Sequence, residues 1–170
     1  MTLPQYATVA DVARAATGGW DELAQRASAS SLVDGVLLQA RADGADTSAW
    51  PPEAVTQAGV ALARAQDVIN RASRHADTLL FMRYRKQMPL GADVVQASSL
   101  PDAVAAIALR RLYGASVPEE LRKGTQWADD YLADLMKGRA SLGVEDAVVP
   151  TSPTTVRVRA PRHTFDLDRY

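Results

Sequence analysis

The stretch 51-PPEAVTQAGVALARAQDVINRASRHADTLLFMRYRKQ-87 decides the fold of this chain. Apolar side chains recur at helical spacing from Val55 to Leu80, and no proline interrupts them. Proline is tolerated in the first turn of a helix but not in its interior, so Pro51 and Pro52 mark the start. The segment therefore predicts one helix of about 50 Å at roughly 1.5 Å per residue, the central element of a mainly α-helical bundle.

Two shorter helices are predicted on the N-terminal side of this segment. Thr8 followed by Asp11 forms an N-cap pattern, and apolar residues at helical spacing follow it. Residues 20–29 repeat that spacing and carry two acidic residues in the first turn. Residues 30–42 are apolar but fit a strand and a helix equally well, and residues 43–50 predict a polar loop.

On the C-terminal side, residues 88–91 (MPLG) break the long helix and two further helices follow. Residues 99–112 have apolar side chains at helical spacing, and a proline lies in the first turn of this predicted helix. Ser116 and Glu119 match a capping box at the start of the next helix, which should end at residues 137–138 (KG).

Composition narrows the class of protein. The chain has 170 residues, of which 47% are hydrophobic and 23% charged, which is typical of one compact globular domain. It has no cysteine, so disulfides and cysteine-based metal sites are excluded. Its formal charge of −1 excludes a globally basic coat for nucleic acid. The sequence has no bilayer-length apolar run and no signal-peptide pattern, so we expect synthesis in the cytoplasm without membrane insertion.

No residue pattern indicates catalysis. The two histidines, His75 and His163, lack a second ligand at a recognised spacing, and the phosphate-loop, dinucleotide and nucleophile-elbow motifs are absent. The acidic pairs 119–120 and 129–130 are adjacent, and adjacent helical residues point in different directions. We therefore expect no enzyme activity, no cofactor and no metal ion.

The C-terminal residues differ from the rest of the chain. Prolines exclude a helix beyond Gly143, and residues 155–159 (TVRVR) alternate like a strand. We therefore divide the chain into a helical domain, residues 1–146, and an extended, partly β-strand arm, residues 147–170. The arm mixes arginine with apolar residues, so it should dock on protein, either on its own domain or, as its alternation favours, on another subunit.

A second group of candidate contact residues lies at the C-terminal end of the predicted long helix. Arg83, Arg85 and Lys86 lie beside the aromatic Tyr84. Cations complement the negative end of a helix dipole, and the same residues could form a contact face for a charged partner.

The order of these segments resembles the phage Mu-like Gp36 family over nearly the whole chain. The residues that carry the resemblance are 6–12 (YATVADV), 20–23 (WDEL), 72–80 (ASRHADTLL), Arg83-Tyr84, Pro89-Leu90, 107–113 (IALRRLY), 131–132 (YL), 137–143 (KGRASLG) and 161–166 (PRHTFD). Each motif alone is a helix pattern with an aromatic or glycine landmark. Their shared order carries the resemblance.

The resemblance implies a head–tail connector or adaptor protein of tailed phages. Such a subunit would assemble in the host cytoplasm into a ring, usually of roughly twelve copies, in the virion neck beneath the portal protein. The ring would extend the channel for genomic DNA, without sequence specificity, and dock a tail terminator or stopper protein. On this view Arg157, Val158, Arg159, Phe165 and Tyr170 anchor the arm on the portal or a neighbouring subunit. Arg83, Tyr84 and Arg85 are a candidate subunit or channel contact.

The alternative is a small helical DNA-binding or regulatory protein with a helix-turn-helix around Gly114. Its recognition helix would then begin with Glu119 and Glu120, which repel phosphate, instead of the residues that read base edges. A mobility assay on duplex DNA separates this alternative from the connector.

Overall fold

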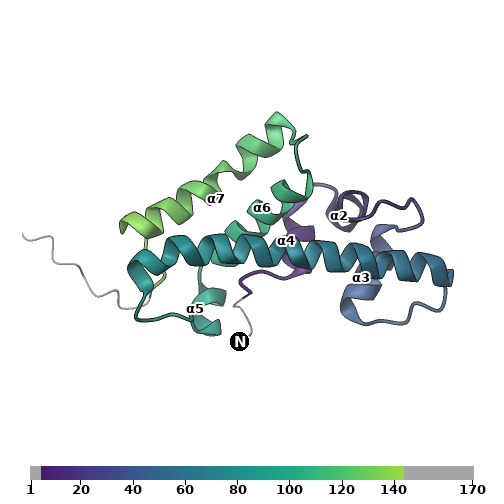
Figure 1. The fold of residues 1–170 in the computed structure, drawn as a ribbon, viewed down its shortest axis with the longest axis horizontal. Coiled ribbons are helices and arrows are strands. Elements are labelled where there is room, and N and C mark those ends of the chain that lie inside the picture. The colour runs from purple at the N-terminus through teal and green to yellow at the C-terminus, as the bar shows by residue number, and fades with distance from the viewer. Residues whose placement is uncertain (1–4, 144–170) are drawn as a thin grey trace, which may run out of the picture.

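The computed structural model describes residues 5–143, which form seven α-helices and no strand (Figure 1). The helices are α1 (Val9–Ala15), α2 (Gly19–Ala27), α3 (Gly35–Asp43), α4 (Pro52–Tyr84), α5 (Ala92–Ala97), α6 (Leu100–Leu112) and α7 (Glu119–Lys137). The predicted mainly α-helical class is confirmed. The arm at residues 147–170, its strand at residues 155–159 and the boundary after residue 146 lie outside the described residues.

The long helix α4 runs the length of the molecule, as its sequence predicts (Figure 1). Pro52 lies at its first helical position, where a missing N–H costs nothing. Its buried face consists mostly of alanine, with Ile69, Leu80 and Tyr84 as the large side chains. Small side chains let neighbouring helices approach closely, so α2, α3, α6 and α7 all pack against α4. The opposite face of α4 is exposed.

The most deeply buried helix is α6, not α4. Nine of its thirteen residues are buried, from Leu100 to Leu112, because α1, α4 and α7 surround it. Figure 1 shows α6 between the long helix and α7. A helix that is apolar on almost every side belongs inside a bundle. The core therefore centres on α6, and α4 supports it along one side.

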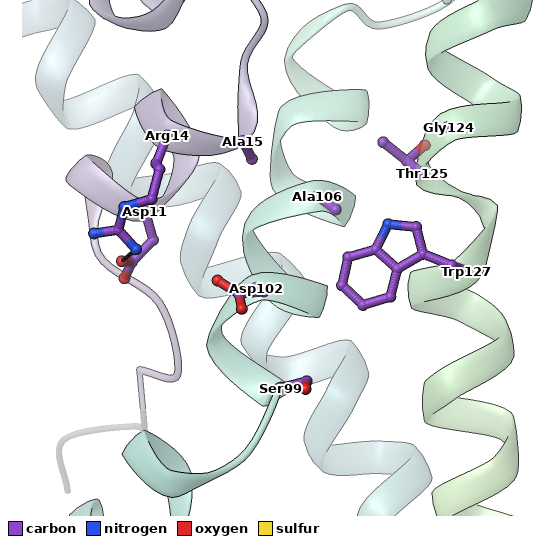
Figure 2. A pocket seen from close by; sticks show the side chains of 9 residues that line it. All are labelled: Asp11, Arg14, Ala15, Ser99, Asp102, Ala106, Gly124, Thr125 and Trp127. Carbon is purple, nitrogen blue, oxygen red and sulfur yellow. Dashed lines mark ion pairs between the residues drawn. The ribbon is translucent and has the colours of Figure 1, made fainter.

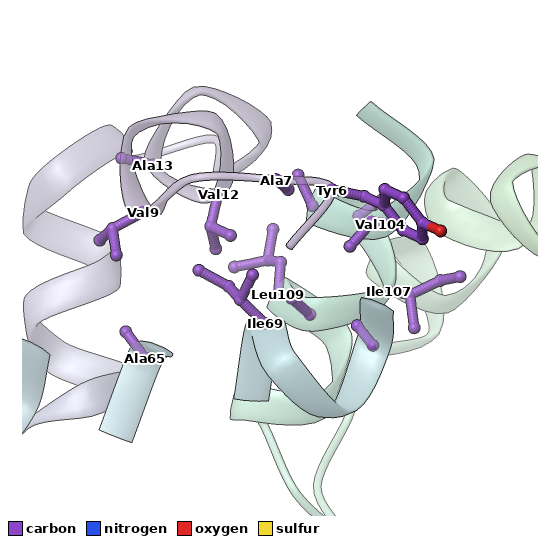
Figure 3. Packing of buried hydrophobic residues seen from close by; sticks show 14 of the residues in the cluster. Tyr6, Ala7, Val9, Val12, Ala13, Ala65, Ile69, Val104, Ile107 and Leu109 are labelled. Carbon is purple, nitrogen blue, oxygen red and sulfur yellow. The ribbon is translucent and has the colours of Figure 1, made fainter. Parts of the chain in front are cut away.

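The N-terminal segment closes this core from one side (Figure 3). Val12 lies over Ile69 of α4 and Leu109 of α6, and the Tyr6 ring lies beside Val104 of α6. The backbone N–H of Tyr6 donates to Ser73 Oγ at 3.2 Å, which satisfies a buried polar group. Residues far apart in sequence thereby fix where α1 begins.

The predicted cap of α1 is confirmed. Asp11 N donates to Thr8 Oγ1 at 3.2 Å, and Thr8 N donates to Asp11 Oδ2 at 2.8 Å. This reciprocal pair is a capping box that satisfies two backbone donors. The predicted box at Ser116 is wrong, because α7 starts one residue after Pro118 and has no side-chain capping bond. Proline already supplies the backbone geometry there.

The structure resolves the open assignment at residues 30–42 in favour of a helix, α3. Asp34 Oδ1 accepts a hydrogen bond from Leu37 N at 2.7 Å and caps its start. Leu37 and Leu38 are fully buried, because α3 packs against α2 and α4. The short helix α5 was not predicted, since six residues are too few for a periodic signal.

Candidate protein-interaction surface

The end of α4 holds the end of α7 in place. Arg83 Nη1 donates to the carbonyl oxygen of Ala140 at 2.8 Å and to that of Leu135 at 3.3 Å. Tyr84 Oη accepts a hydrogen bond from Leu142 N at 3.3 Å. The last carbonyls of a helix have no partner within it, and a cation there also complements the helix dipole. This pair of residues therefore fixes where the chain leaves α7.

The structure places the candidate contact residues Arg83, Tyr84 and Arg85 in three different surroundings. Tyr84 is fully buried, so its ring belongs to the core and is not offered to a partner. Arg83 is partly buried and engaged by α7. Arg85 is exposed, and its guanidinium lies 5.7 Å from the centre of the Phe81 ring. Of the three residues, Arg85 is the most exposed and Tyr84 the least.

Two large apolar side chains lie beside Arg85. Phe81 is 51% exposed and Met82 is 76% exposed. Lys86 adds a second exposed cation, and we call these four residues the α4-end patch. Phe81 also borders a small cavity of about 300 Å³ with Met88 and Pro89. An apolar patch rimmed by charge is typical of a protein interface.

Three helices enclose a second candidate surface (Figure 2). A cavity of about 370 Å³ lies between α1, α6 and α7. The indole of Trp127 extends from α7 toward Ala106 of α6, and 44% of this side chain is exposed. Asp102 of α6 and Gly124 of α7 also line the cavity. An exposed tryptophan that lines a groove is the kind of side chain that anchors protein interfaces.

A larger cavity, of about 640 Å³, adjoins the first one at Ser99, which lines both. Its walls are α5, α7 at Tyr131, and the segment from Ser141 to Gly143. We call the two cavities together the α7 groove. The groove thus runs beside α7 and reaches the last residue that the structure describes.

The α7 groove carries more carboxylates than cations. Asp11 pairs with Arg14 at 3.2 Å. Within residues 5–143, Asp93 and Asp102 form no hydrogen bond or ion pair through their side chains. Each lies in the first turn of its helix, α5 or α6, where the helix dipole favours a negative charge, but neither has a cationic side chain as a partner among the described residues. Sequence analysis missed them as groove residues because only the fold places them along the same groove.

A third group of exposed apolar side chains lies on α3, α4 and the loop before α3. Its members are Leu32, Val36 and Val60. Single exposed apolar residues are common on soluble proteins and carry no argument alone. Together with the α4-end patch and the α7 groove, they show that apolar side chains are exposed on several separate surfaces.

Groups suited to chemistry are scarce among residues 5–143. No three histidine or acidic side chains in that range are placed to hold a metal ion. His75 is exposed on α4. None of the described helices has the length and apolar content to cross a membrane. The predicted arm anchors, Arg157, Val158, Arg159, Phe165 and Tyr170, lie outside the described residues.

Packing of the N-terminal segment against α4 explains the shifted pKa values of Tyr6 and Asp77. Burial, reinforced by a hydrogen bond to Asp77, raises the pKa of the Tyr6 hydroxyl well above its usual value. Burial likewise raises the pKa of Asp77, more than the bond from Tyr6 lowers it. This pair ties the N-terminal segment to α4.

Comparison with known proteins identifies the family. No curated protein and no solved structure matches the chain. The family model described as Bacteriophage Mu, Gp36 matches residues 6–160, which include the helical body and part of the C-terminal arm. This match agrees with the resemblance found in the order of the sequence motifs. The chain belongs to the phage Mu Gp36 family.

Proposed function

We propose that this protein is a structural head–tail connector subunit of a tailed phage. In this proposal roughly twelve copies form a ring in the virion neck, bind the portal protein above and receive a tail terminator or stopper protein below. The observation that carries the proposal is membership of a phage protein family over almost the whole chain. The exposed apolar side chains and the near-neutral charge support it.

The described surface is built for contacts on several sides. A ring subunit needs two different patches for its neighbours and further surfaces for the proteins above and below. The monomer offers the α4-end patch, the α7 groove and the exposed residues Val36 and Val60. Exposed apolar side chains rimmed by charge, such as Met82 in the α4-end patch, are typical of protein interfaces.

Charge supports a channel role for the ring. Tight DNA binding comes from clustered cations that release counterions from phosphate. The chain's formal charge is −1, so a ring of these subunits would let genomic DNA pass without holding it. No enzyme activity and no cofactor belong to this proposal.

The helix-turn-helix alternative gains no support from the geometry. Glu119 and Glu120 are exposed in the first turn of α7, which is the position from which a recognition helix would read the bases. Glu119 is paired with Arg122 and, at 3.5 Å, with Lys123. Those two cations are therefore partly neutralised by an acid that repels phosphate.

Native mass measured on the full chain, alone and mixed with its portal ring, tests the proposal. A species of roughly a dozen subunits, or a monomer that becomes bound to the portal, is the expected result. A monomer or dimer that does not bind the portal would overturn the proposal. Deleting residues 151–170 then tests the arm, because retention of both ring formation and portal binding would remove its predicted anchoring role.

A mobility assay at moderate salt tests the alternative. The connector proposal expects no shift of a short duplex, whatever its sequence. A sequence-dependent shift would favour the regulatory alternative instead.

A further inference from the structure

The α7 groove begins where the described chain ends. Gly143 and Leu142 line its larger cavity, and Ser99 connects that cavity to the one beneath Trp127. The described chain therefore ends in the wall of this groove, and 27 residues, 144–170, follow in sequence.

Several features of the groove lack a purpose in the isolated chain. The side chain of Trp127 is 44% exposed and extends toward Ala106. Gly124 lies inside α7, where glycine weakens a helix, and an added Cβ there would meet no atom within 4 Å. No neighbour within residues 5–143 requires a glycine at this position. A chain that packs closely against α7 would require one, because it would occupy the open space.

The excess of carboxylates in the groove favours a positively charged occupant. Asp93 and Asp102 have no partner in the described residues, so a cationic segment would compensate them. The C-terminal arm contains such a segment. Arg157, Arg159 and Arg162 fall within six residues, and residues 147–165 contain no acidic side chain. Val158, Pro161 and Phe165 supply apolar contacts for an exposed indole, and an arginine can also stack on it.

Chain length favours the groove of a second copy over the chain's own groove. Arg157 follows Gly143 by fourteen residues, which span about 46 Å when extended at roughly 3.3 Å per residue. Helix α7, which the groove follows, has 19 residues and is about 28 Å long at 1.5 Å per residue. An extended arm from Gly143 would therefore pass beyond its own groove before the first arginine.

We propose that residues 157–165 of one copy occupy the α7 groove of the neighbouring copy, with arginines facing Asp93 and Asp102 and apolar residues covering Trp127. The inference rests on the proposed ring, because it requires a neighbour. Such an exchanged arm links each subunit to the next. Each exposed ion pair contributes little alone, but a tethered arm is present at high effective concentration, so weak contacts suffice.

Disulfide trapping tests the proposal directly, because the chain has no cysteine of its own. Ser99→Cys places a thiol where the two cavities meet, on an exposed residue whose side chain makes no capping bond. Ala160→Cys places one between Arg159 and Pro161. The two full-length variants, one of them carrying a tag, are mixed, assembled as in the native-mass measurement, and oxidised.

The expected product is a heterodimer on a non-reducing gel. It should form in the mixture and be absent when either variant is oxidised alone. The double variant Ser99→Cys/Ala160→Cys should give a ladder of linked copies, since each arm reaches the next subunit. Ser48→Cys is the matched control partner for Ala160→Cys, because it is an exposed serine in the loop before α4 and should give no heterodimer.

The outcomes separate this inference from the proposed function. A ring of normal native mass without heterodimer overturns arm exchange and leaves the connector proposal intact. An internally linked monomer from the double variant shows that the arm folds onto its own domain, which also overturns it. A parent chain that forms no ring and ignores the portal removes both proposals.

Charge reversal provides a second test that does not depend on cysteine. Asp93→Arg/Asp102→Arg should reduce ring formation by the full chain, and Arg157→Asp/Arg159→Asp should do the same. Combining all four changes should recover a large part of it, because the attraction is restored with opposite sign. Loss of assembly without recovery, in variants that keep the helical signal of the parent, would contradict the proposed pairing.

Discussion

The side chain of Arg83 binds the backbone of Ala140, 57 residues away, with 2.8 Å between Nη1 and the carbonyl oxygen. The contact joins the last turn of α4 to the segment that leaves α7. Gly138 makes it geometrically available, because its φ of 76° turns the chain back toward α4. The end of the longest helix therefore fixes the position of the described segment that follows α7.

Arg83→Ala should destabilise the monomer by about 1–3 kcal/mol, since two backbone carbonyls lose a charged donor. Arg85→Ala is the control, because Arg85 is exposed on the same turn of chain, and its loss should change the free energy of unfolding by less than about 0.5 kcal/mol. Urea unfolding followed by circular dichroism measures both. Equal effects in the two variants would remove the anchoring role of Arg83.

Thr8→Ala should cost about 1 kcal/mol of stability, because it removes the capping box of α1. Ser116→Ala should be nearly neutral, since the structure shows no side-chain cap at the start of α7. Thermal unfolding of the two variants under one set of conditions decides between them. A large effect at Ser116 would mean that the sequence-based capping box does form.

Two glycines in α7 and its cap should respond in opposite directions to alanine. Gly138→Ala should destabilise by about 1–2 kcal/mol, because the left-handed backbone there strains any Cβ, and the new atom would also approach Arg83 Nη1 to 3.2 Å. Gly124→Ala should stabilise the monomer by about 0.5–1 kcal/mol, since its surroundings are open. If the arm packs against Gly124, the same change should weaken ring formation, which native mass detects. A Gly124→Ala variant no more stable than its parent would contradict the open geometry.

Asp77→Asn should flatten the pH dependence of stability on the acidic side. Burial raises the pKa of Asp77 in the folded chain, so the folded state holds the proton more tightly than the unfolded state does. The free energy of unfolding should therefore fall as pH rises from about 4 through this raised pKa. Asparagine keeps an acceptor for the Tyr6 hydroxyl and carries no charge to bury.

Chemical denaturation at a series of pH values measures this effect. At pH 7 the Asp77→Asn variant should be at least as stable as the parent, and the difference should shrink toward pH 3. A parent chain whose stability rises through that window because of Asp77 would contradict the assigned direction.

Local sequence patterns were sufficient for most of the helices. The stretch from Pro52 to Tyr84 predicted α4 because proline, periodic apolar residues and the absence of a further breaker act over neighbouring residues only. Gly138 predicted the end of α7 for the same reason. The order of these motifs was also enough to identify the family. Patterns failed at α3, where packing against α2 and α4 decides between strand and helix.

Function-related residues depended on contacts that no local pattern contains. Arg83, Tyr84 and Arg85 are neighbours in sequence, yet one anchors α7, one lies in the core and one is exposed. Asp11, Ser99 and Trp127 are far apart in sequence, and only the packing of α1, α6 and α7 brings them to one groove. The sequence by itself determined most of the helices and the family, because backbone preferences act locally. The tertiary structure alone decided which side chains are exposed together, because burial depends on every helix that packs nearby.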